Sequence, residues 1–109
     1  MAKIELTVAV YEKKTFDIEF PLYRMHECSD HDYTCVYYSR HTADNVCITI
    51  RVMTRQNVVE YELNRSHYVT LNGDDSDYIL AKGNYHELSS DEFNAILGEA
   101  TEFLNSFRI

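Results

Sequence analysis

Apolar side chains recur at every second position along much of the chain before residue 64, a period that places them on one face of a β-strand. Residues 4–10 form the first such row and residues 16–22 form the second, with Lys13 and Lys14 between them. The pattern predicts a β-hairpin over these residues, with its turn at the two lysines.

Further strands are predicted where the alternation continues, at residues 33–40, 46–52 and 59–63, with shorter candidates at 68–71 and 78–85. Glu60 and Glu62 point away from the apolar row of their strand. One face of this strand is therefore expected to be exposed to solvent. The stretch NGDDSD supplies residue types that tolerate the left-handed backbone of turns. Together these segments predict an antiparallel β-meander of about five to six strands between about residues 3 and 85.

The final element has a different period. Apolar residues from Phe93 to Phe107 fall at steps of three and four, which align them along one side of an α-helix. Ser89 and Glu92 have the spacing of a capping box, and Asp91 and Glu92 lie where the helix dipole favours negative charge. We therefore expect a helix over about residues 90–107.

Such a helix is not stable alone in water, whereas burial of seven apolar side chains contributes on the order of 10 kcal/mol. The stripe must therefore lie against the sheet. The sequence predicts a two-layer α+β protein with residues 1–109 in a single domain, in which the C-terminal amphipathic helix packs on one face of the antiparallel sheet.

Charge is distributed unevenly along the chain. Residues 1–71 contain 8 Lys/Arg and 10 Asp/Glu, net −2, while residues 72–109 contain 2 Lys/Arg and 8 Asp/Glu, net −6, which together give the total of −8. An acidic surface repels phosphate backbones and favours basic partners, so we expect a basic protein surface as partner and no direct nucleic-acid binding. No run approaches the roughly 18 apolar residues of a membrane span, and the N-terminus is no signal peptide, so a cytoplasmic protein without membrane contact is predicted.

The stretch HECSDHDYTC, residues 26–35, is the densest group of reactive side chains. If Cys28 paired with Tyr33 across a hairpin, His26 would lie opposite Cys35 with His31 at the tip, which approaches a Cys2His2 zinc set. The spacing matches no common zinc module, however, and the cysteines are equally consistent with small buried hydrophobes beside a solvated turn. Activation of Cys28 or Cys35 by a histidine is a further alternative.

No phosphate-binding glycine loop or other catalytic motif is present, so we expect a non-catalytic protein without a cofactor. The acidic residues Asp74, Asp75 and Asp77, together with Asp91, Ala95, Gly98 and Glu102 on the outer side of the predicted helix, form the expected interaction surface. An exposed glycine within a helix costs about 1 kcal/mol relative to alanine, which indicates a role other than helix stability for Gly98.

The favoured hypothesis is a small acidic interaction domain that binds a basic protein surface, as an inhibitor or regulator that mimics nucleic-acid charge. The alternative is a small zinc protein or thiol-dependent enzyme built on His26, Cys28, His31 and Cys35. RNA binding through tyrosines on an open sheet face is a third hypothesis, which the pI of 4.9 opposes. An open sheet edge also permits a homodimer. In its general character, short, acidic and tyrosine-rich, the chain is similar to accessory proteins carried by phages and mobile elements.

Overall fold

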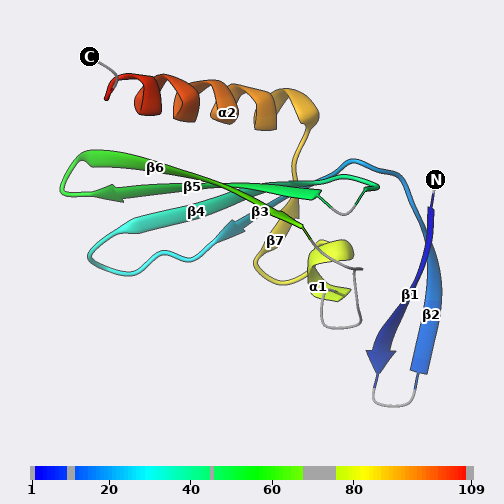
Figure 1. Ribbon diagram of the computed structural model, residues 1–109. Helices are drawn as coiled ribbons and strands as arrows, with labels where there is room; N and C mark the ends of the chain where they lie inside the picture. Colours follow the sequence, from blue (N-terminus) through cyan, green and yellow to red (C-terminus); the bar gives the residue numbers. More distant parts are fainter. Residues whose placement is uncertain (1, 10–11, 45, 68–75, 108–109) are drawn as a thin grey trace.

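The structure is a computed structural model that describes residues 2–9, 12–44, 46–67 and 76–107. In chain order its elements are β1 (Ala2–Ala9), β2 (Glu12–Ile18), β3 (Leu22–Glu27), β4 (Thr34–His41), β5 (Val46–Arg55), β6 (Val58–His67), α1 (Ser76–Ile79), β7 (Tyr85–Glu87) and α2 (Ser90–Asn105) (Figure 1).

Five strands form one antiparallel sheet in the order β6-β5-β4-β3-β7. The strands from β3 to β6 follow one another as a meander, and β7 returns to pair with β3 at the opposite edge. The α2 helix lies across one face of this sheet (Figure 1). The predicted two-layer α+β architecture, with an antiparallel sheet and a C-terminal helix on one face, is confirmed.

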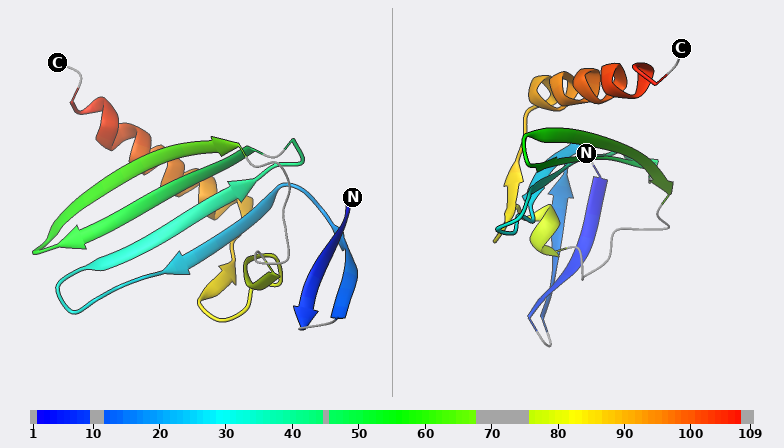
Figure 2. Two further views of the ribbon diagram at one scale, coloured as in Figure 1. Left: turned by 60° about the horizontal axis from the view of Figure 1, so that its bottom comes forward. Right: turned by 90° about the vertical axis from the view of Figure 1, so that its left-hand side faces the viewer.

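The first hairpin does not join this sheet. β1 and β2 form a two-stranded sheet of their own (Figure 2). Pro21 separates β2 from β3, and proline cannot donate to a strand ladder. The turn predicted at Lys13 and Lys14 is wrong, because both residues lie within β2 and pair with Thr7 and Leu6.

The strand predicted at residues 78–85 is also wrong, while the one predicted at 68–71 lies outside the described residues. Residues 76–79 instead form the short helix α1, and the chain then turns through Ala81 and Gly83, whose φ angles are 53° and 65°. These left-handed angles interrupt an extended backbone, so β7 begins only at Tyr85.

The main core lies between α2 and the sheet. Phe93, Ile50 and Ala100 are fully buried there, and the ring of Phe93 packs on Tyr23 of β3 with their centroids 5.5 Å apart. The capping box is present, because the Ser89 hydroxyl accepts the Glu92 N–H at 3.1 Å and the Glu92 carboxylate accepts the Ser89 N–H at 3.4 Å. Local signals in the sequence therefore fix both where α2 begins and which face it buries.

A second buried cluster lies on the opposite face of the sheet. Ile18, Leu22 and Ile79 form it, with Phe20 and Tyr78 packed against them. Neighbouring residues of β3 show that the two helices cover different faces: Tyr23 contacts α2, whereas Arg24 donates hydrogen bonds to α1. Figure 2 shows α1 and α2 on the two sides of the sheet.

We expect Phe93→Ala to lower the free energy of unfolding by about 3–5 kcal/mol, because it leaves a cavity in the centre of the main core. Phe107→Ala is a matched control: Phe107 is 70% exposed, so the same truncation should change stability by less than about 0.5 kcal/mol. Urea denaturation of the two variants measures both values. Equal effects would show that α2 is not held by Phe93.

Candidate functional site

The hairpin that carries the candidate metal ligands has a different register from the one that the zinc hypothesis requires. His26 pairs with Tyr37, not with Cys35, and the Cys28 N–H donates to the Cys35 carbonyl at 2.8 Å. A bridge between Asp30 and Tyr33 places only two residues at the tip. The four candidates therefore do not form the predicted arrangement.

Their environments also differ. Cys28 and His31 are exposed, whereas Cys35 is buried. His26 stacks between Tyr85 and Tyr37, at centroid distances of 4.6 Å and 6.3 Å. Within the described residues, no group of three or more His, Cys, Asp or Glu side chains is arranged to hold a metal ion. The zinc and thiol hypotheses stay predictions without support from this geometry.

The face of the sheet opposite α2 carries a row of side chains at directly opposed positions on five strands: Tyr85, His26, Tyr37, Arg51 and Glu62. Arg51 and Glu62 form an ion pair. The two faces of the His26 ring are turned toward its tyrosine neighbours, with interplanar angles of 26° and 23°. The His26 ring thus has an aromatic neighbour on each side, and the hypothesis that tyrosines of this sheet face bind RNA stays a prediction.

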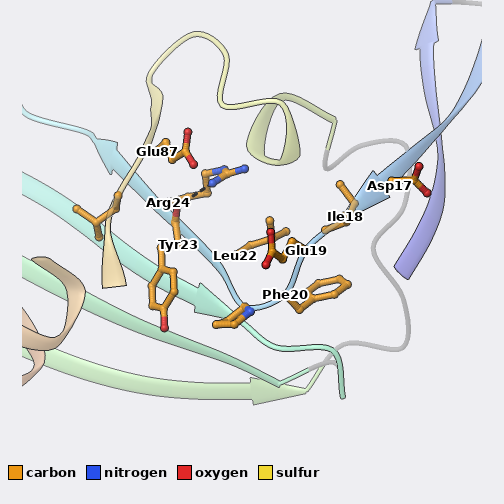
Figure 3. A pocket seen from close by; sticks show the side chains of 10 residues that line it. Asp17, Ile18, Glu19, Phe20, Leu22, Tyr23, Arg24 and Glu87 are labelled. Carbon is orange, nitrogen blue, oxygen red and sulfur yellow. Dashed lines mark hydrogen bonds between the residues drawn. The ribbon is translucent and has the colours of Figure 1, made fainter. Parts of the chain in front are cut away.

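A cavity of about 360 Å³ lies where the chain passes from β2 to β3 beside the end of β7 (Figure 3). Arg24 is the arginine that lines it. Its guanidinium donates to the carbonyls of Tyr23, Tyr78 and Ile79 at 2.8, 3.1 and 2.9 Å. These bonds commit the guanidinium to fixing α1 on β3, so among the described residues that line the cavity no cation is left free for an anionic ligand.

We expect Arg24→Lys to loosen α1, since a lysine ammonium cannot reproduce the planar fork that bonds two carbonyls of that helix. Amide hydrogen exchange over residues 76–82 should become about tenfold faster or more. Peptides from α2 serve as the internal control and should exchange at the wild-type rate. Unchanged exchange in α1 would mean that the second buried cluster holds it without the arginine.

The predicted interaction surface is divided by the fold. Asp77 is exposed in α1, on the side of the sheet away from α2, and Asp74 and Asp75 lie outside the described residues. Asp91, Ala95, Gly98 and Glu102 are all exposed on α2. Their spacing of four, three and four positions aligns them as one stripe along the helix, which we call the outer stripe.

The last turn of α2 contains Glu102 and no basic residue, although the helix dipole there favours cations. Glu99 lies about one turn earlier. The Glu99 carboxylate accepts a hydrogen bond from the Tyr61 hydroxyl at 3.2 Å. Burial raises the pKa of the Tyr61 hydroxyl above its ordinary value, and the Glu99 carboxylate raises it further. Negative charge therefore gathers where α2 meets β6.

Gly98 has no packing reason to be glycine. A Cβ atom added to it would meet nothing within 4 Å, and its backbone needs no left-handed angle. The missing side chain therefore leaves open space on the outer side of α2.

One group of exposed apolar side chains was not predicted from the sequence. The large hydrophobic side chains that are exposed in the described residues are Val58, Val59, Leu104 and Phe107, at 59%, 39%, 38% and 70%. Val58 and Val59 begin β6 with their side chains on opposite faces of the sheet, Leu104 lies in the last turn of α2, and Phe107 follows that helix in a turn. The sequence contained a signal for it, because the predicted apolar stripe of the helix runs on past residue 103, where the helix approaches the sheet edge.

The chain matches no protein-family model, no curated protein sequence and no solved structure. Within the part of the chain that the structure describes, no helix is both long and apolar enough to cross a membrane. The structure thus defines the class: an α+β protein in which an acidic helix covers one face of an antiparallel sheet.

Proposed function

We propose that this protein is a non-catalytic interaction domain that binds a basic protein surface through the outer side of α2. The observation that carries the proposal is the placement of Glu102 in the last turn of α2, where the helix dipole favours cations, with Glu99 about one turn before it and no basic residue in that last turn. Helix stability alone would select the opposite charge at this end. A basic partner would convert this arrangement into a favourable one.

The shape of the outer stripe supports the same function. Asp91 and Glu102 lie at its ends, about 16 Å apart along the axis at the rise of an α-helix. The small residues Ala95 and Gly98 lie between them and admit close approach of a partner backbone. Lysine or arginine side chains of the partner would then meet the acidic ends.

A domain of this kind acts as a regulator or inhibitor when the basic surface that it covers is itself a nucleic-acid-binding surface. Carboxylates spaced along a helix present negative charge to the cleft that phosphates would occupy. This role follows from charge complementarity and requires no catalytic group.

We expect the double variant Glu99→Gln, Glu102→Gln to bind its partner about five- to tenfold more weakly, because each surface charge pair contributes about 1 kcal/mol or less. The partner is first identified by affinity capture from the native host, and its affinity is then measured by calorimetry at low and at about physiological salt. Asp30→Asn, Asp32→Asn removes the same charge at the β3–β4 hairpin and should leave binding unchanged. Wild-type affinity that does not depend on salt would exclude this mode of recognition.

Gly98→Ala tests the close approach directly. Alanine should stabilise the fold by a few tenths to about 1 kcal/mol, since the added methyl group meets open space and glycine is the poorer helix former. The same methyl group should weaken partner binding if a backbone packs on the stripe. Thermal unfolding gives the stability, calorimetry gives the affinity, and a variant that is more stable yet binds as tightly would show that the partner does not pack there.

A further inference from the structure

We infer that β6 accepts an extended segment of the basic partner as an additional strand, beneath the end of α2, and that this segment alternates basic and apolar side chains. The inference rests on the proposed function, because it names the mode in which a basic partner binds. It is carried by an edge of the sheet with which no other described strand pairs, by the reach of the helix, and by the side chains gathered there.

β6 is a long and regular sheet edge. It has ten residues, pairs with β5 without a bulge and contains no proline, and its charged side chains are those of Glu60, Glu62 and Arg65. The other edge, β7, has only three residues. Of the two edges, β6 is therefore the one long enough to receive another strand.

The hairpin turn shows which amides are free. Gln56 and Asn57 have φ angles of 51° and 66°, as in a two-residue hairpin turn, so Val58 bonds to Arg55 across it. Hydrogen-bonded pairs then alternate along an antiparallel ladder. The outward N–H groups are consequently those of Val59, Tyr61, Leu63 and Arg65.

The helix is longer than the part of the sheet that it covers. Phe93 packs over Tyr23 of β3, and Phe103 packs over Tyr61 of β6 at 5.3 Å. The helix crosses the strands obliquely, because Tyr23 is level with Arg65, four residues along β6 from Tyr61. It reaches the edge strand at Phe103. Phe107 follows two residues after the helix ends at Asn105, where its N–H donates to the Leu104 carbonyl at 3.3 Å, and thus lies close to the position that a strand beyond β6 would occupy. Figure 2 shows this end of α2 reaching past β6.

Apolar side chains surround that position on the helix side. Phe107 packs edge-on against Phe103 at 5.2 Å, which extends the line of rings from Tyr61 outward. Val59 lies on the same face of β6 as Tyr61, because the two residues are two positions apart. An apolar side chain of an added strand would be covered by Phe107 and flanked by Val59.

The charges around β6 indicate which kind of segment would pair with this strand. Glu60 and Glu62 lie on the other face of β6, and Arg51 neutralises only Glu62 through its ion pair. Glu99 adds a further carboxylate from above the strand. A second copy of this chain would bring the same carboxylates to the edge, whereas basic side chains at every second position would complement them. The occupant is therefore a basic and apolar strand of another protein.

The test uses the full chain and an end-blocked, fluorescein-labelled peptide of ten alternating lysine and valine residues, followed by fluorescence anisotropy. Val59→Pro removes an outward N–H but no bond to β5, and should weaken binding about tenfold. Phe107→Ala and Glu60→Gln should each weaken it about fivefold. Asp32→Asn, at the tip of the β3–β4 hairpin, is the matched charge control and should leave peptide binding unchanged. Asp91→Asn reports whether the outer stripe of α2 contributes to peptide binding. A peptide of five lysines followed by five valines should bind at least about tenfold more weakly than the alternating one.

Three results would overturn the inference. In the first, the peptide binds equally to all three edge variants, or only Asp91→Asn weakens it; the helix surface then acts alone and the proposed function stands. In the second, the native partner binds but the alternating peptide does not. In the third, sedimentation shows a dimer of this chain that Val59→Pro dissociates, so that a second copy occupies the edge. Loss of salt-dependent partner binding, in contrast, would remove the proposed function itself.

Discussion

The burial of Phe93 between α2 and the sheet is the contact on which the rest of the structure depends. Its ring is fully buried, packs on Tyr23, and lies beneath the guanidinium of Arg40 at 5.5 Å. The backbone leads directly to it, because the Leu88 N–H donates to the Tyr23 carbonyl at 3.2 Å just before the helix begins. With the first turn of α2 fixed over β3, the direction of the helix decides every later contact.

The consequence is a mismatch between the helix and the sheet. α2 begins over β3, where Phe93 packs on Tyr23, and it reaches the edge strand β6 at Phe103, which packs on Tyr61. Because Phe103 already lies over the edge strand, the residues that follow it have no described strand beneath them. The exposure of Leu104 and Phe107 is therefore a result of geometry: the apolar stripe continues while the sheet ends.

How much of this was predictable depends on whether the signal was local. The start, the period and the buried face of α2 follow from Ser89, Glu92 and the spacing of the apolar residues, all of which act within a few turns. The sequence constrains strand ends and register less strongly, because the alternation of apolar and polar residues is compatible with several positions of the turn. The β3–β4 register differs from the predicted one by an even shift, which keeps His26 and Cys35 on one face while moving them out of opposition. Asp77 lies apart from α2 because α1 packs on the other face of the sheet. No local pattern of residues in the sequence predicts on which face α1 packs.

Two features at one end of the molecule are unfavourable for the isolated chain: carboxylates against the helix dipole and an unpaired ten-residue strand edge beneath exposed apolar side chains. Each of these two features alone costs little free energy, and marginally stable proteins tolerate such costs. Both features occur at the junction of α2 and β6, and a single bound segment would offset both. A basic strand would supply the missing positive charge, the missing backbone partners and the missing layer beneath Phe107. A partner segment that is basic, extended and apolar at alternate positions, as we propose, would thus offset both unfavourable features of this edge.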